Sequence, residues 1–250
     1  MVTTALKSNS EVFLFPPRWI PRQPVWSNFT YVFQLLPFGR FMVNSAIITV
    51  LVMVGDLLSC SIVAYAFARL PARGKTTAFF LVLSTMMLPF HVTMIPRFIL
   101  FRSVGWVDTF LPLIVPSFFA NPYQVFLLRQ FFLTIPRDLD DAAAIDGCGV
   151  FAIYWRIIMP LSQPIAITIL LQSFLYNWND FLAPLIYLNS ERNKTVALGL
   201  ASILGYPAGG QGRWEILMAA STIALVPCVF LFFIGQGFFI QGITMTGMKG

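Results

Sequence analysis

The stretch IPRDLDDAAAIDGCGVFAIYWRIIMPLSQP, residues 135–164, is the one long segment of this chain that combines charged residues with helical signals. Pro136 can open a helix, because proline lacks the backbone N–H that a first helical turn leaves unpaired. Three carboxylates follow in the predicted first turn: Asp138, Asp140 and Asp141. Negative charge at this position is stabilised by the positive end of the helix dipole and by the unpaired backbone N–H groups. Three alanines, the residue of highest helix propensity, then continue the helix. The pattern predicts a short helix.

A turn and a second helix are predicted directly after these alanines. Asp146 and Gly147 supply the turn, and apolar residues then recur at helical spacing as far as Pro160. Small alanine side chains let another backbone approach closely, so this shape suits docking into a groove of a partner. The same pattern also suits an amphipathic helix that lies on the lipid surface, and the residues alone leave both interpretations open.

The composition of the whole chain excludes a soluble globular fold. Of its 250 residues, 58% are hydrophobic and 10% charged, against about 45–50% and about 25% in ordinary soluble domains. One water-soluble core cannot bury 26 Phe and 17 Pro, whereas a bilayer solvates apolar side chains directly. We therefore expect an all-α, polytopic membrane protein.

Five stretches are long and apolar enough to cross the bilayer, which takes about 20 residues. They are residues 41–68, 76–96, 109–128, 157–179 and 216–248. The one acid within them is Asp56, for which we expect structural pairing with a neighbouring helix rather than proton transport. Several stretches contain or adjoin proline, such as Pro89 and Pro227, which allows kinks.

The first 40 residues and the distribution of positive charges give weaker evidence about the topology. Residues 1–40 contain four prolines and two tryptophans between positions 16 and 26, which indicates an extended, interfacial arm outside the membrane. Lys and Arg divide almost equally between the two sides of the predicted bundle. Only the cluster Arg69, Arg73 and Lys75 favours a cytoplasmic location for its own side, and we interpret this cluster as a lipid-facing anchor.

Residues 135–160 resemble the EAA loop of ABC importer permeases. That pattern is Glu-Ala-Ala, three residues, Gly, nine residues, Ile, one residue, Leu and Pro; here Asp141 replaces Glu and Met159 replaces Leu. The resemblance implies that this loop is cytoplasmic and docks on a separate ATPase subunit. The coupling residues that it implies are Asp141, Ala142, Ala143, Asp146, Gly147, Ile157 and Pro160.

Four further segments are similar to the carbohydrate-uptake branch of these permeases. They are AYAFARLPARGK (64–75), PLSQP (160–164), NWNDFLAPLIYL (177–188) and GITMTGMKG (242–250). The resemblance implies the type I permease fold, which usually has six spans. We therefore expect residues 1–40 to follow a first span that precedes the recorded start, with the transmembrane permease domain at 41–250. A protein that works with five spans is the alternative.

Residues for covalent chemistry are missing from the sequence. A phosphate-binding loop ending at Gly74-Lys75-Thr76 would need glycine where Arg69 stands. The single histidine, His91, cannot build a zinc site, and the three cysteines lie far apart. We expect no catalytic residue, no metal site and no cofactor in this chain, with ATP and Mg²⁺ bound by partner ATPase subunits.

Polar residues in an apolar setting are the candidates for contact with a solute, because amides, carboxylates and aromatic faces match a sugar's hydroxyl groups and CH surfaces. The stronger set is Asn177, Trp178, Asn179 and Asp180, and the weaker set is Asn121 and Gln124. The alternative interpretation of the stronger set is that these residues form hydrogen bonds between helices. For Asn121, the alternative is that it simply breaks a helix.

The sequence therefore predicts the permease subunit of an ATP-binding cassette importer for a sugar or sugar-like solute in a bacterial inner membrane. Its expected partners are a second permease, an ATPase dimer and an extracytoplasmic solute-binding protein, which the glycine-rich loop 189–215 is suited to meet. The alternative is a stand-alone, ion-coupled transporter or channel, for which Asp56 and Asp180 are the only pair of acids available. A membrane enzyme is a third possibility.

Overall fold

A computed structural model describes the backbone of residues 1–205 and 213–246 and the side chains of residues 1–205 and 213–235. The described residues form helices and no strand. In chain order these are α1 (Val2–Ala5), α2 (Asn9–Val12), α3 (Ser27–Leu35), α4 (Phe38–Arg69), α5 (Lys75–Ser84), η1 (Thr85–Met87), α6 (Phe90–Ser103), α7 (Leu111–Ile114), η2 (Val115–Phe119), α8 (Pro122–Thr134), α9 (Asp138–Ile145), α10 (Val150–Ile153), η3 (Tyr154–Ile158), α11 (Met159–Leu161), α12 (Gln163–Trp178), α13 (Leu182–Tyr187), η4 (Glu191–Asn193), α14 (Val196–Leu204) and α15 (Trp214–Thr246). The predicted all-α class is confirmed.

Three of the five predicted spans are found as single candidate stretches, one of which consists of α7, η2 and α8 in succession, and two are bent pairs of helices. Phe38–Arg69, Leu111–Thr134 and Trp214–Gly235 are each long and apolar enough to cross a membrane. The predicted span 76–96 instead consists of Lys75–Met87 and Phe90–Ser103, which meet at 94°. The predicted span 157–179 belongs to a second bent pair, with an angle of 78° between Val150–Leu161 and Gln163–Trp178.

The first bend has a local cause in Pro89. The residue before a proline avoids the helical region, and Leu88 adopts φ −83° and ψ 109°, so the helix that contains Thr85 ends there. Pro89 itself is the extended N-cap of α6, with ψ 142°. The predicted span 76–96 therefore corresponds to a pair of helices with a bend at Pro89, the proline that allowed a kink.

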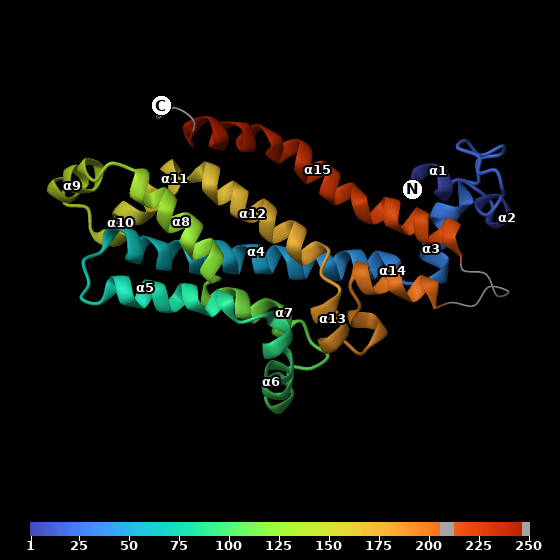
Figure 1. Ribbon diagram of the computed structural model, residues 1–250, viewed down its shortest axis with the longest axis horizontal. Coiled ribbons are helices and arrows are strands. Elements are labelled where there is room, and N and C mark those ends of the chain that lie inside the picture. Colours follow the sequence, from blue (N-terminus) through green and yellow to red (C-terminus); the bar gives the residue numbers. More distant parts are fainter. Residues whose placement is uncertain (206–212, 247–250) are drawn as a thin grey trace. The chain divides into compact units, whose positions relative to one another are not determined.

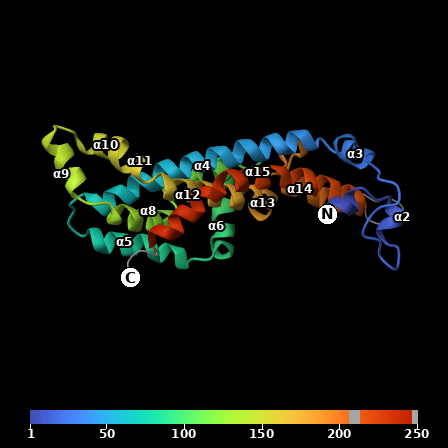
Figure 2. The ribbon, with the colours of Figure 1, turned by 90° about the horizontal axis from the view of Figure 1, so that it is seen from above.

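The chain folds into two compact units. Unit 2 comprises Val50–Trp106, Leu111–Phe174 and Phe233–Gly250. In it α5 and α8 run alongside the C-terminal part of α4 (Figures 1 and 2). Phe79 of α5 fills the space between them: its ring stacks on Phe126 of α8 at 6.5 Å and meets Phe67 of α4 edge-on at 5.4 Å. The guanidinium of Arg129 lies 4.2 Å from the centre of the Phe79 ring.

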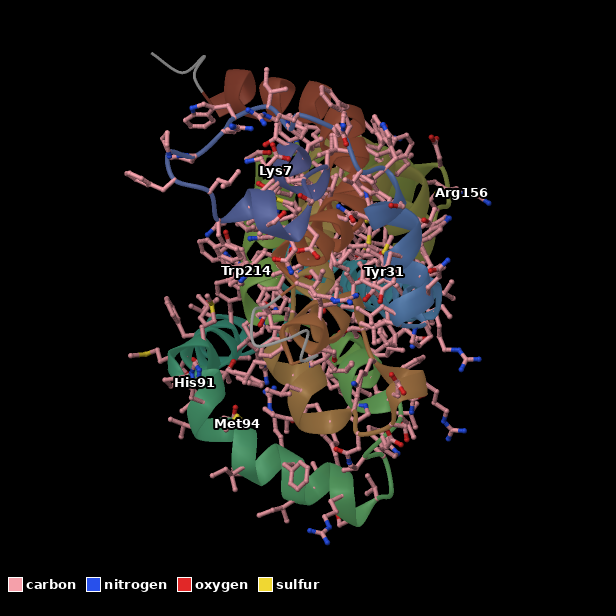
Figure 3. The ribbon with its side chains drawn as sticks, turned by 90° about the vertical axis from the view of Figure 1, so that its right-hand side faces the viewer. Lys7, Tyr31, His91, Met94, Arg156 and Trp214 are labelled. Carbon is pink, nitrogen blue, oxygen red and sulfur yellow. The ribbon has the colours of Figure 1, made fainter. Side chains whose placement is uncertain are left out.

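Unit 1 comprises Met1–Thr49, Val107–Phe110 and Leu175–Phe232. Its N-terminal residues are less extended than predicted, because α3 gives this arm nine helical residues. The arm folds back on itself: Asn28 Nδ2 donates to the carbonyls of Ala5 and Lys7 at 2.8 and 2.9 Å. The buried ammonium of Lys7 donates to the carbonyl of Arg18 at 2.5 Å (Figure 3).

Asp108 holds together two loops of unit 1. Its Oδ1 accepts from the backbone N–H groups of Asn189 and Ser190 at 2.9 and 2.8 Å, and its Oδ2 accepts from the Ser190 hydroxyl. These donors, first the hydroxyl and then the N–H of Ser190, lower the pKa of Asp108 to about 2 from its ordinary 3.8. Because the folded pKa is lowered, the stabilisation is present above about pH 4 and is lost as the pH falls through about 2.

Asp108→Asn tests this clamp with little change of shape. Asparagine tolerates the positive φ of 62° at this position, so the substitution mainly removes the charge. We expect the variant to lose about 1–2 kcal/mol of stability at pH 7 and to approach the native chain between pH 4 and 2. Thermal unfolding in detergent at several pH values measures this. Glu191→Gln, at an exposed carboxylate nearby, is the control, and a loss that does not depend on pH contradicts the assignment.

Candidate functional site

The segment 138–147 forms the helix and turn that its sequence predicts. α9 covers Asp138–Ile145, with three aspartates in its first turn. Gly147 then adopts φ +83°, a conformation that side chains other than glycine rarely take. The N–H of Gly147 donates to the Ala144 carbonyl at 3.1 Å, and the N–H of Cys148 donates to the Ala143 carbonyl at 2.9 Å. This pair of bonds is a Schellman motif, which ends the helix sharply and fixes the direction of the following chain.

The alanines of α9 face opposite sides. Ala143 is 7% exposed and packs in the hydrophobic core of unit 2. Ala142 and Ala144 are exposed, and so is Asp141. Ile145 follows with 87% of its surface exposed. α9 therefore has one attached side and one open side of small residues ending in an isoleucine, and close approach by a partner backbone is open to Ala142 and Ala144 but not to Ala143.

The second half of the segment is joined to α4. Tyr154, in the π-helical turn η3, shares a 2.7 Å hydrogen bond with the buried Ser61 hydroxyl, and Tyr65 donates to the Val150 carbonyl at 3.3 Å. Ile157 lies half-buried in this turn, and Pro160 is exposed in α11. The exposed Arg156 points away from the helices (Figure 3). Asp146 is exposed at the end of α9. All the predicted coupling residues thus lie in one continuous segment of unit 2.

The stronger set of solute candidates lies beside a cavity in unit 1. The cavity has a volume of about 320 Å³, and its lining includes Trp178, Asn179 and Phe181 together with Ser221, Ala224 and Cys228 of α15. The indole N–H of Trp178 donates to the Ala224 carbonyl at 3.0 Å, so the ring is held in place at the edge of this cavity. The exposed amide of Asn179 donates to the Leu175 carbonyl at 2.8 Å. The structure thus brings an aromatic ring, an amide and a hydroxyl to one hollow.

The other two members of that set have different surroundings. Asp180 Oδ1 accepts from the backbone N–H groups of Leu182 and Ala183 at 3.1 and 3.3 Å, which places this carboxylate at the start of α13. Asn177 is half-buried and does not line the cavity.

Asn121 and Gln124, the weaker set, lie in unit 2. Asn121 is the N-cap of α8, and its side chain accepts from the Tyr123 N–H at 3.0 Å. Gln124 is buried; its Nε2 donates to Asp56 at 3.1 Å, and the Ser173 hydroxyl donates to the same oxygen at 2.7 Å. Sequence reasoning expected structural pairing for Asp56 but missed Ser173, because nothing in the sequence marks one serine of an apolar helix as its partner.

The histidine, the cysteines and the acids of the described residues do not gather into a metal-binding cluster. His91 lies exposed near the start of α6 (Figure 3), with its ring edge-on to Phe90 at 6.1 Å. Cys60, Cys148 and Cys228 are free thiols.

Comparison with known proteins gives consistent relatives over almost the full chain. An arabinooligosaccharides transport system permease protein of Halalkalibacterium halodurans is 36% identical over 249 residues, which is 99% of this chain and 86% of that protein. An sn-glycerol-3-phosphate transport system permease protein of Yersinia pestis is 30% identical over 243 residues, 94% of this chain and 85% of the relative.

The fold also matches a solved structure. A chain of a bacterial ABC transporter involved in the import of the acidic polysaccharide alginate superposes with a TM-score of 0.85 at 22% identity, covering 95% of this chain and 88% of that one. The chain therefore has the type I permease fold of ABC importers.

The model of a transport family matches residues 58–245, a range that includes the bent spans, α9 and its turn. Together with these relatives, the match shows that the chain is a multi-pass membrane protein and belongs to the family of binding-protein-dependent transport system inner membrane components, the permease subunits of ABC importers.

Proposed function

We propose that this chain is one of two permease subunits that together translocate a sugar or sugar-like solute across a bacterial inner membrane. ATP hydrolysis takes place on a separate ATPase dimer, which binds ATP and Mg²⁺. An extracytoplasmic binding protein delivers the solute. The observation that carries the proposal is the two-sided helix α9, attached to unit 2 through Ala143 and open on the side of Ala142 and Ile145.

In the proposed mechanism α9 acts as a lever. Closure of the ATPase dimer on nucleotide moves the docked helix as a rigid body, and the sharp Schellman end passes this motion to α10 and η3. The two bent pairs, at 94° and 78°, supply sites where a span can change direction without breaking intact helical turns. Alternating access of a central pathway follows from such motion. The chain itself makes and breaks no covalent bond.

The cavity of unit 1 and the relatives both support a sugar or polyol as the solute. A ring face from Trp178, an amide from Asn179 and a hydroxyl from Ser221 match the CH surfaces and hydroxyl groups of a sugar or polyol. The two relatives are named for arabinooligosaccharide and sn-glycerol-3-phosphate transport, both hydroxyl-rich solutes. Contact of this cavity with the solute is part of the proposal.

The ion-coupled alternative has less support. Asp56 accepts from two neutral donors, Gln124 and Ser173, and Asp180 accepts from backbone N–H groups at the start of α13. Each acid thus takes part in a separate local network. If the alternative holds, reconstituted chain without an ATPase will show uptake that depends on a proton or sodium gradient.

Gly147→Ala and Gly149→Ala form a matched pair that tests the lever. Both positions have open space around an added Cβ, but Gly147 has φ +83° and Gly149 has φ −73°. Only the first substitution strains the backbone, by about 1–2 kcal/mol. In reconstituted complexes we expect Gly147→Ala to lower binding-protein-stimulated ATP hydrolysis and transport several-fold, and Gly149→Ala to leave both nearly unchanged. Equal behaviour of the two variants argues against a role for the turn.

Ser221→Cys tests the cavity by chemical labelling. In a chain whose Cys148 and Cys228 are replaced by serine, a water-soluble maleimide is expected to modify the new thiol, because Ser221 lines the cavity. Arabinooligosaccharides and sn-glycerol 3-phosphate are the two probes, and the one that is transported should slow the labelling several-fold. Ser202→Cys, on α14 outside the cavity lining, is the control. Transport of a probe that leaves the labelling rate unchanged contradicts the assignment.

A further inference from the structure

Arg69 and Asp140 form the one ion pair found among residues 1–205 and 213–235. Arg69 is the last residue of α4, and Asp140 lies in the first turn of α9; Nη1 and Oδ2 are 3.3 Å apart. The two side chains are 4% and 18% exposed. The interpretation of Arg69 as part of a lipid-facing anchor was therefore wrong, because its charge is turned inward towards a carboxylate that the sequence places 71 positions later.

The same guanidinium also holds the end of α8. Its Nη2 donates to the carbonyls of Phe132 and Ile135 at 2.8 and 2.7 Å. These carbonyls lie in the last turn of α8 and at its C-cap, where a helix leaves acceptors unpaired and carries partial negative charge. One buried cation thus connects three helices, an arrangement suited to the planar guanidinium with its five N–H donors in a fixed fork.

α9 has few other attachments to the bundle. The helix has eight residues, and Ala143 is its one buried side chain. The two basic residues near Arg69 do not replace it, because Arg73 is exposed and Lys75 donates to the Leu70 carbonyl at 2.9 Å. The orientation of α9 relative to the rest of unit 2 therefore depends on the pair Arg69–Asp140 at its start and on the Gly147 turn at its end.

We propose that Arg69 is a positioning residue that makes α4, the end of α8 and α9 move together, so that displacement of α9 reaches the transmembrane helices. The inference deepens the proposed coupling function and rests on it. Asp140 and Asp141 then have different roles although they are adjacent: Asp140 faces the bundle, whereas Asp141 stays exposed for a partner.

The test uses the complete reconstituted complex and compares Asp140→Asn with Asp138→Asn. Both remove a carboxylate from the first turn of α9, but Asp138 is exposed and takes no part in the ion pair. For Asp140→Asn we expect assembly with the ATPase and basal hydrolysis to persist, while transport per ATP hydrolysed falls at least about fivefold. Asp138→Asn should keep the native ratio. Native ratios in both variants overturn the proposal.

A double variant covers the case in which Asp140→Asn fails to fold. Arg69→Met with Asp140→Leu removes both charges, so that neither is left buried and unpaired. If this chain assembles and still couples transport to hydrolysis as the native chain does, the pair serves stability alone and the proposal is overturned. If it assembles but hydrolyses ATP with little transport, the proposal is supported. A native chain that binds no ATPase would instead overturn the proposed function itself.

Discussion

A helix of eight residues is too short to be stable by itself, so α9 depends on what holds its two ends and its inner side. The Arg69–Asp140 pair fixes its start, the Schellman bonds at Gly147 fix its end, and Ala143 fills the small space beneath it. The contacts with the rest of unit 2, through Asp140 and Ala143, lie on one side of the helix. The other side remains exposed, and in our proposal it receives the ATPase.

The same arrangement explains how one chain can be both rigid and movable. A membrane helix keeps its hydrogen bonds internal because lipid offers none, so it moves most easily as a whole piece. The breaks between pieces lie where the backbone bonds are already missing, as at Pro89 before α6. In the proposed coupling, force applied at α9 travels to α4 through the largely buried pair Arg69–Asp140, and from η3 to α4 through the buried Ser61–Tyr154 bond.

Local signals in the sequence predicted the features that depend on neighbouring residues. The alanine-rich helix, its turn at Gly147 and the helical class were all predicted from residue type and spacing. The sequence did not show which alanine faces inward, because an eight-residue helix without a polar stripe has no distinct face. Pro89 indicated a break within residues 76–96, but a proline alone does not specify the angle of the bend, which is 94°.

Features that join distant segments were predicted least well. Gln124 was a candidate for solute contact, yet it donates to Asp56, which also accepts from a serine 117 positions away from it. Arg69 belonged to a basic cluster, and no local pattern reveals that its partner is the second of three aspartates in α9. Trp178 and Asn179 were expected to lie together, and the structure adds that Ser221 and Cys228 share their cavity.

The most direct measurement is photo-crosslinking from α9 to the ATPase. The photoreactive residue p-benzoylphenylalanine is incorporated during translation at position 142 or at position 143, and the assembled complex is irradiated. Because Ala142 is exposed and Ala143 is 7% exposed, the account predicts adducts with the ATPase from position 142 and few or none from position 143. Equal adducts from both positions, or none from position 142 in an active complex, would contradict it.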